Sequence, residues 1–123
     1  DKIAAGSIVF SPLAQGLLTD RYIDGKIPSD SRVAEGRWLN GTAITDDYLN
    51  RVRALNDIAK GRDQSLAQLA LSWVLRQPQV TSALIGASSV AQLENNFGAL
   101  AASPLSADEI AAIEPLAVDG TTA

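Results

Sequence analysis

The stretch that most constrains the fold is VTSALIGASSVAQLENN, residues 80–96, which predicts a short apolar strand, a Gly/Ser turn and then a helix. A strand that leads into such a turn and a helix N-terminus is where α/β proteins hold phosphate, because unpaired backbone N–H groups and the helix dipole point at the anion. The ligand would lie against residues 86–96. An ordinary turn that binds nothing explains the same pattern.

Composition narrows the class of protein. The 123 residues, 46% of them hydrophobic, are enough for one modest domain. A net charge of −4 argues against a nucleic-acid surface. There is no Cys and no His, which excludes disulfides, thiolate metal sites and the commonest general base, and we expect no metal. No apolar run approaches the roughly 20 residues of a membrane span and there is no signal peptide, so we expect a soluble, cytoplasmic protein with no membrane partner.

The N-terminal part predicts a second strand-to-loop junction. Residues 1–6 resemble the last turn of a helix with a Gly stop, so we expect an upstream part to precede them. Residues 7–10 (SIVF) predict a strand buried on both faces of a parallel sheet. Residues 11–16 (SPLAQG) then form a loop, in which Gly16 is free to adopt a positive φ. We predict that residues 7–10 and 81–85 are neighbouring parallel strands, with Ser11 and Gly86 at the same edge.

Residues 17–41 form a segment of Asp, Gly, Pro and Ser with little periodicity, longer than an ordinary connection, which favours a functional or mobile loop. Four basic residues gather in it: Arg21, Lys26, Arg32 and Arg37. They are explained either as solvated surface charge or as a clamp over phosphate, because guanidinium matches phosphate oxygens bidentately.

Four helices are predicted from caps and apolar spacing. The first is capped by Thr45 and runs to Gly61, and the second has a capping box of Ser65 with Gln68 and runs to Arg76. Both have the amphipathic spacing of helices that cover a core. The last helix begins with a capping box at residues 106–109, and residues 119–123 should fray.

The third helix follows the Gly/Ser turn and has two distinct faces. A capping box of Ser89 with Gln92 is expected to begin it. Its inward apolar face is predicted to consist of Val90, Leu93, Phe97 and Leu100. Its polar strip consists of Ser89, Gln92, Asn95 and Asn96.

Two parallel strands joined by a helical crossover make a βαβ unit. Such a sheet is not stable with two strands alone, because parallel strands need both faces and both neighbours covered. We therefore predict that the chain is a fragment of a larger α/β protein.

Four motifs resemble one family: FSPLAQGLLT from Phe10, IPSDSR from Ile27, QLALSWVL from Gln68 and LIGASSVAQLENN from Leu84. In this order and spacing they resemble the C-terminal part of the aldo-keto reductases, in the branch of glyceraldehyde-phosphate reductases and potassium-channel β subunits. The resemblance implies that residues 1–123 are the C-terminal portion of a (β/α)8 TIM barrel, with its last two parallel strands and covering helices. Residues 17–44 would be a long cofactor-clamp loop.

The resemblance also implies an NADPH site. Phe10 matches an aromatic residue that stacks on nicotinamide, residues 11–15 a loop along the pyrophosphate, and Arg32 the Arg of a Ser-Arg pair. Gly86, Ser88 and Gln92 match positions around the 2′-phosphate. The implied cofactor-binding residues are Phe10, Ser11, Pro12, Leu13, Ala14, Gln15, Gly16, Arg21, Arg32, Gly86, Ser88, Gln92, Asn95 and Asn96.

Two residues depart from the family pattern. Asn95 and Asn96 stand at an adenine-facing pair that is usually Glu-Asn, so Asn95 removes a charge but keeps an acceptor. Asp20, where relatives often have Gly, places a carboxylate beside Arg21 that could hold this Arg away from phosphate.

The implied activity is hydride transfer between NADPH and a small-molecule aldehyde or ketone. The family uses an Asp, Tyr, Lys and His tetrad on earlier strands, so no catalytic residue is assigned here. Tyr22 and Tyr48 lie in the clamp loop and on a packing helix, which favours core or surface roles. Two other readings stay open: a non-catalytic NADPH-sensing regulatory subunit of the same fold, and a cofactor-free helical interaction module. A homo-oligomer is compatible with each.

Overall fold

The structure, a computed structural model, describes residues 5–36 and 41–117, without the side chain of Arg32. Residues 1–4 and the tail at 119–123 lie outside the described residues, so the predictions for them are not tested. The strands and α-helices are β1 Ser7–Phe10, α1 Arg32–Glu35, α2 Asp46–Gly61, α3 Leu66–Leu75, β2 Val80–Leu84, α4 Val90–Phe97 and α5 Ala107–Ile113. The 3-10 turns are η1 Ala14–Gly16, η2 Asp20–Tyr22, η3 Gly41–Ala43 and η4 Gly98–Ala101.

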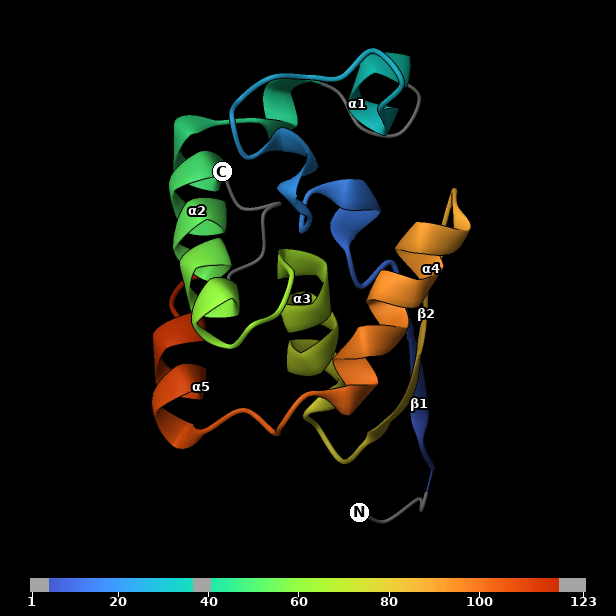
Figure 1. The fold of residues 1–123 in the computed structure, drawn as a ribbon, viewed down its shortest axis with the longest axis vertical. Coiled ribbons are helices and arrows are strands. Elements are labelled where there is room, and N and C mark those ends of the chain that lie inside the picture. Colours follow the sequence, from blue (N-terminus) through green and yellow to red (C-terminus); the bar gives the residue numbers. More distant parts are fainter. Residues whose placement is uncertain (1–4, 37–40, 118–123) are drawn as a thin grey trace.

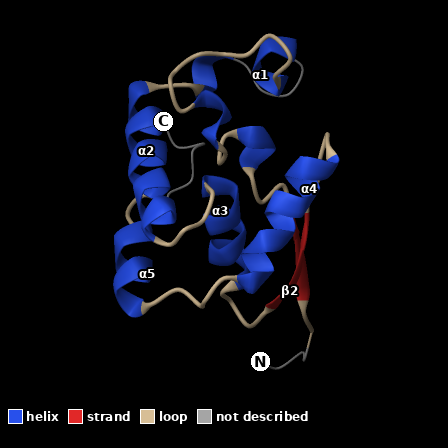
Figure 2. Cartoon of the chain, viewed as in Figure 1, coloured by secondary structure: helices blue, strands red, loops and turns tan. Residues whose placement is uncertain are grey.

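The two strands are parallel neighbours, as predicted from the order of elements. Ser7 pairs with Val80 and Phe10 with Leu84, with one irregularity after Ser7. Parallel strands end at the same edge of a sheet, so the loops that begin at Ser11 and after Leu84 leave from one edge. Figure 1 shows β1 and β2 side by side, and Figure 2 shows them at the side of the molecule opposite α2 and α5.

The prediction that the strand of residues 7–10 is buried on both faces is wrong for the described chain. Ile8 is 72% exposed and Phe10 is 80% exposed, and Leu84 is also exposed. The described part of the chain supplies a two-stranded sheet whose main helical contact is α3 against β2. One helix covers only part of one face, so the apolar side chains on the rest of the sheet remain in solvent.

The core lies between α2, α3 and α5, and α2 and α3 are the two helices that were predicted to cover a core. The Thr45 side chain accepts a hydrogen bond from the Tyr48 N–H at 3.1 Å and caps α2. Ser65 and Gln68 form the predicted capping box of α3, with bonds of 2.9 and 3.2 Å. The buried apolar cluster comprises Tyr22, Val33, Tyr48, Val52, Leu55, Ala59, Leu66, Leu69 and Ile113.

The apolar face of α4 does not turn inward as predicted. Val90, Leu93, Phe97 and Leu100 are exposed, and so are Ser89, Gln92 and Asn95 of the polar strip, while Asn96 and Ala99 are buried. The reason is a polar contact with the start of α3: the Gln68 side chain donates to the Asn95 carbonyl at 2.7 Å, and the Asn95 side chain donates to Ser65 Oγ at 3.0 Å. Periodicity fixes which residues share a face, but the neighbouring helix decides which face turns inward.

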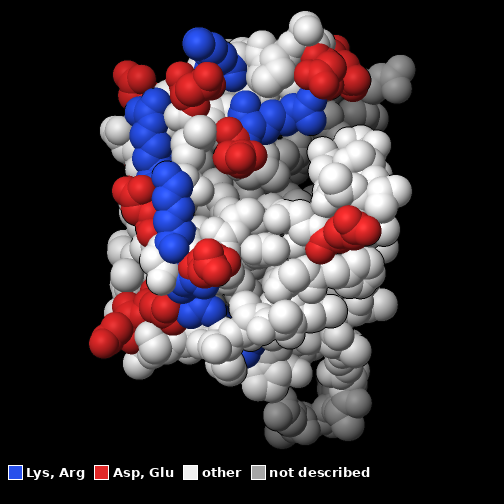
Figure 3. All heavy atoms as spheres, in the orientation of Figure 1, with Lys and Arg blue, Asp and Glu red and all other residues white. Residues whose placement is uncertain are grey.

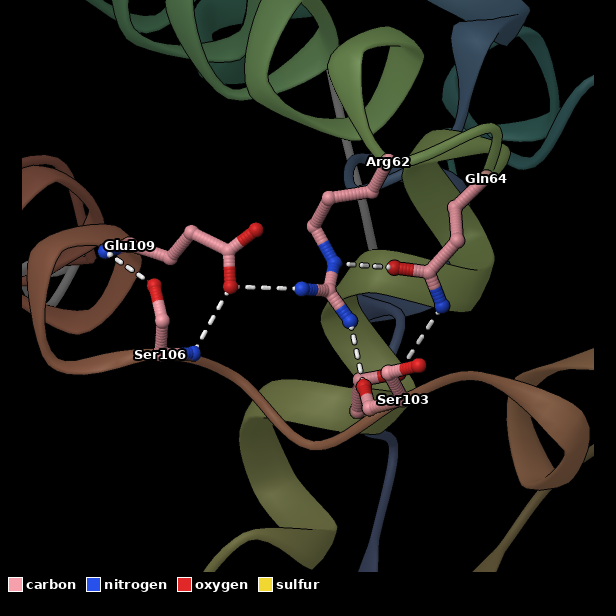
Figure 4. A network of polar contacts seen from close by, with 6 residues as sticks. Arg62, Gln64, Ser103, Ser106 and Glu109 are labelled. Atoms are coloured by element: carbon pink, nitrogen blue, oxygen red, sulfur yellow. Dashed lines mark hydrogen bonds and ion pairs between the residues drawn. The ribbon is translucent and has the colours of Figure 1, made fainter.

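A polar network joins the end of α2 to the start of α5 (Figure 4). The Arg62 guanidinium donates to Gln64 Oε1 at 2.8 Å, to the Ser103 carbonyl at 2.6 Å and to Glu109 Oε2 at 2.5 Å. Ser106 and Glu109 form the predicted capping box of α5. The network therefore fixes the connection that precedes α5 and brings Ile113 into the core.

In its described residues, the segment predicted as a long loop contains the short helical turns η2, α1 and η3, and it packs Tyr22 and Val33 into the core. Among the described residues, no helix combines the length and apolar character needed to cross a bilayer.

Candidate cofactor site

The loop after β1 has an unusual backbone. Ser11, Ala14 and Gln15 adopt φ values of 52°, 48° and 59°, and Gly16 adopts 99°. Left-handed conformations are disfavoured for residues with a Cβ, and they persist where the surroundings impose them, often at ligand sites. Only Gly16 was predicted to adopt positive φ, because Ser, Ala and Gln carry no sequence signal for it.

Hydrogen bonds close this loop on itself. The N–H groups of Gly16 and Leu18 both donate to the Leu13 carbonyl, at 3.0 and 3.1 Å. The Thr19 hydroxyl donates to the Gly16 carbonyl at 2.6 Å. From α2, the Tyr48 hydroxyl donates to the Leu17 carbonyl at 2.7 Å. Residues 11–18 thus form a turn that is held in one conformation by hydrogen bonds.

The second junction, residues 85–89, leads into α4. Ser89 caps the helix by accepting from the Gln92 N–H at 3.2 Å. The Gln92 side chain departs from the predicted capping box, because its Oε1 accepts from the N–H and the hydroxyl of Ser88, both at 2.9 Å. Since Ser88 occupies the oxygen of this carboxamide, the group that Gln92 has left to offer a ligand is its NH₂ donor.

The start of α4 fits an anion. The amides of Val90 and Ala91 lie in the first turn, where a helix has no internal acceptor for them. The helix dipole places partial positive charge at the same end, and the first turn contains no Asp or Glu. Gly86, Ser88 and Gln92 are exposed around it.

Asn95 and Asn96, the pair predicted to face adenine, are less open to a ligand than Gly86, Ser88 and Gln92. Asn95 is exposed, but its side chain donates to Ser65 Oγ and so is directed toward α3. Asn96 is buried. Adenine contact by these two residues stays a prediction.

In the segment after the loop, the two basic residues with described side chains, Arg21 and Lys26, each lie beside a carboxylate. Arg21 pairs with Asp30, with Nη2 2.9 Å from Oδ1 and a further bond to the Asp30 carbonyl. The carboxylate that holds Arg21 is therefore Asp30, and not Asp20 as expected. Lys26 lies 3.9 Å from the carboxylate of Asp24. On the face shown in Figure 3, basic side chains lie beside acidic ones.

The other expected clamp residues are not placed: the side chain of Arg32 and all of Arg37 lie outside the described residues. At the end of β1, Phe10 exposes its ring, whereas Pro12, Leu13, Ala14, Gln15 and Gly16 are half-buried. The structure thus brings the residues from Phe10 to Gly16 to the same sheet edge as the turn before α4.

Neither tyrosine is suited to act as an acid. Tyr22 is fully buried, and its hydroxyl has no hydrogen-bond partner among the described residues. Burial raises the pKa of Tyr48 to about 12, with a smaller contribution from Tyr22. A general acid needs a pKa nearer the working pH, which argues against this role for Tyr48. Of the core or surface roles predicted for the two tyrosines, the structure shows the core role for both.

Two parallel strands end at one edge, one in a fixed turn and the other in a helix N-terminus, and this is the kind of edge at which α/β proteins commonly bind nucleotides. Comparison with known sequences supplies the family. The model of the aldo/keto reductase family matches residues 5–117, and the chain belongs to the aldo-keto reductase family.

Two curated relatives illustrate the kinds of protein to which the chain is similar. L-glyceraldehyde 3-phosphate reductase of Escherichia coli (strain K12) is 49% identical over 119 residues, which cover 94% of this chain and 34% of the relative. A probable voltage-gated potassium channel subunit beta of Oryza sativa subsp. japonica is 40% identical over 107 residues, covering 85% of this chain and 33% of the relative. The chain spans about a third of the length of the curated relatives it matches.

Proposed function

We propose that the chain is the C-terminal part of a (β/α)8 barrel that reduces aldehydes or ketones to alcohols with NADPH. In this proposal the segment supplies nucleotide-binding loops, and the catalytic tetrad lies in the part of the barrel before it. The observation that carries the proposal is the shared edge of β1 and β2, from which the left-handed loop and the start of α4 both extend. Phosphate sites in such barrels commonly use the loops after the last two strands.

Each group of residues has a distinct task in this proposal. The exposed ring of Phe10 offers a flat apolar surface for the nicotinamide ring, and residues 11–16 follow the pyrophosphate. Ser88, Gln92 and the first amides of α4 bind the 2′-phosphate by charge-assisted hydrogen bonds. When bound, the nicotinamide cofactor supplies the hydride for carbonyl reduction.

A second function has a specific observation in its favour. The 40% identity to proteins named as potassium channel subunits beta supports a nucleotide-sensing regulatory subunit with little turnover. The reductases are similar over more of the chain, at 48% and 49% identity, and we place catalysis first for that reason. Steady-state turnover of NADPH by the full-length protein with a panel of aldehydes and ketones separates the two functions.

The cofactor-free helical module receives less support. A self-contained module would cover its apolar surface, whereas here the sheet exposes Ile8, Phe10 and Leu84 and α4 exposes Phe97. Exposed apolar surface of this kind marks an interface with further protein.

Gln92→Glu tests the phosphate site of the full-length protein. A Glu at this position can still accept from Ser88, as Gln92 Oε1 does, and replaces only the NH₂ donor by a charged oxygen. Each 1.4 kcal/mol of added repulsion lowers NADPH affinity by about tenfold. NADH carries no 2′-phosphate, so its affinity should change little.

The measurement is a fluorescence titration of both nucleotides against wild type and variant. Equal losses of affinity for NADPH and NADH would show that Gln92 only stabilises the local turn and does not contact the 2′-phosphate. Arg32→Ala, measured in the same way, should weaken NADPH, with an effect on NADH set by how far Arg32 also contacts the pyrophosphate.

A further inference from the structure

Tyr48 links α2 to the loop after β1. Its hydroxyl donates to the Leu17 carbonyl at 2.7 Å, across 31 positions of sequence. The tyrosine ring is 9% exposed and belongs to the buried cluster, so the position of the hydroxyl is fixed by the core. The bond therefore anchors a surface loop to the buried core.

The bonded peptide unit closes the left-handed turn. The Leu17 carbonyl and the Leu18 N–H belong to one planar peptide group. The Tyr48 hydroxyl donates to the Leu17 oxygen of this peptide group, and the Leu18 N–H of the same group donates to the Leu13 carbonyl at 3.1 Å. Both polar atoms of the peptide group are thus held, the oxygen by α2 and the N–H by the loop itself.

Such a restraint matters because the turn is disfavoured on its own. Ser11, Ala14 and Gln15 all have left-handed backbones without being glycine. A loop of this kind reverts to other conformations when the contacts that impose it are removed. A ligand that binds only the ordered loop then binds more weakly, in proportion to the fraction of molecules in which it is ordered.

We propose that Tyr48 is a positioning residue for the nucleotide site, holding residues 11–16 in the conformation that receives the pyrophosphate. The inference rests on the function proposed above. Tyr48 contacts neither the cofactor nor the substrate in this scheme and acts through the Leu17 carbonyl. The high pKa that burial gives Tyr48, about 12, keeps the hydroxyl a donor throughout the pH range of an assay.

Tyr22 provides a matched control. It is the other buried tyrosine of the same cluster, and its hydroxyl has no hydrogen-bond partner among the described residues. Tyr48→Phe and Tyr22→Phe each delete one buried hydroxyl, but only Tyr48→Phe deletes a bond to the loop.

The experiment compares both variants with wild type in the full-length protein. Tyr48→Phe should raise the Kd for NADPH about fivefold, the effect of one net hydrogen bond. The kcat at saturating NADPH should stay within about twofold, because bound nucleotide restores the loop. Amide hydrogen exchange in the unliganded protein should accelerate at Gly16 and Leu18 and remain unchanged in α3. Tyr22→Phe should leave Kd and these exchange rates unchanged.

Three results would overturn the inference: equal Kd changes in both variants, a Tyr48→Phe loss that appears in kcat instead of Kd, or unchanged exchange at Gly16 and Leu18. Failure of the underlying function looks different. If wild type does not bind NADPH, the proposed function fails, while exchange at Gly16 and Leu18 still decides whether Tyr48 holds the loop.

Discussion

Arg62 Nη1 lies 2.5 Å from Glu109 Oε2, and this oxygen also accepts from the Ser106 N–H at 2.7 Å. A single carboxylate oxygen is thus the partner of a nearly buried guanidinium and the acceptor for the backbone N–H of Ser106, the N-cap of α5. The two tasks can be separated by substitution, because Gln is also a capping-box residue but carries no charge.

Glu109→Gln should destabilise the protein by about 1–3 kcal/mol, the cost of depriving a largely buried Arg of its anionic partner. Glu109→Ala should cost more, since it also removes the side-chain acceptor of the Ser106 N–H, which is one of the two bonds of the capping box. Urea denaturation of the three proteins measures both effects. Equal losses in the two variants would show that the ion pair, and not the cap, accounts for all of the stabilisation.

The same pair predicts a pH dependence. The hydrogen bond from Arg62 and, next, that from Ser106 lower the pKa of Glu109 from its ordinary value of 4.5. Between the lowered pKa and 4.5 the unfolded chain binds more protons than the folded one, so stabilisation is full above 4.5 and is lost as pH falls through the lowered pKa. The difference in Tm between wild type and Glu109→Gln should therefore shrink below about pH 4.5. A difference that stays constant down to pH 3 would contradict this assignment.

Gly98 and Gly61 should respond oppositely to alanine. A Cβ at Gly98 would overlap the side-chain amide of Gln68, which caps α3 and bonds the Asn95 carbonyl, so Gly98→Ala should cost about 1–3 kcal/mol. A Cβ at Gly61 meets nothing within 4 Å, and Gly61→Ala should stabilise α2 by about 0.5–1 kcal/mol. Thermal unfolding of both variants checks the signs.

Gly86→Ala separates ligand contact from folding. A Cβ at Gly86 meets no described atom within 4 Å, so Tm should stay unchanged. If the 2′-phosphate approaches this backbone, losing one charge-assisted bond should weaken NADPH by about tenfold or more. Unchanged affinity for NADPH in the full-length protein would remove Gly86 from the site.

The exposed apolar surface predicts that Phe97→Ser has a favourable effect in the separate chain and an unfavourable effect in the full-length protein. As a separate 123-residue chain the protein should aggregate and bind a hydrophobic dye, and Phe97→Ser should reduce dye binding, because Phe97 is 58% exposed. In the full-length barrel proposed above, the same change should destabilise by about 3 kcal/mol or more. A monomeric 123-residue chain with a cooperative thermal transition would count against the prediction.

Local signals predicted the elements well. The capping residues Ser65 and Ser106 mark true helix starts, and β1 spans the predicted residues, while β2 begins one residue earlier than predicted. These features depend on neighbouring residues, which the sequence contains.

Contacts between residues that are far apart in the sequence were harder to predict. The inward side of α4 depends on Asn95 meeting Ser65, and the partner of Arg21 is Asp30 because the segment after the loop folds back on itself. The left-handed backbone at Ala14 and Gln15 is imposed by surrounding contacts, and no property of Ala or Gln predicts it.

In the nucleotide site proposed above, the left-handed loop also limits how cofactor preference can be engineered or diverge. β-branched residues are poorly tolerated at positive φ, so Val, Ile and Thr are largely closed to positions Ser11, Ala14 and Gln15. Ser88 and Gln92 have exposed side chains beside an ordinary helix start and carry no such restriction. A library that seeks to exchange one nicotinamide cofactor for the other should therefore randomise the positions around α4 and leave the loop after β1 as it is.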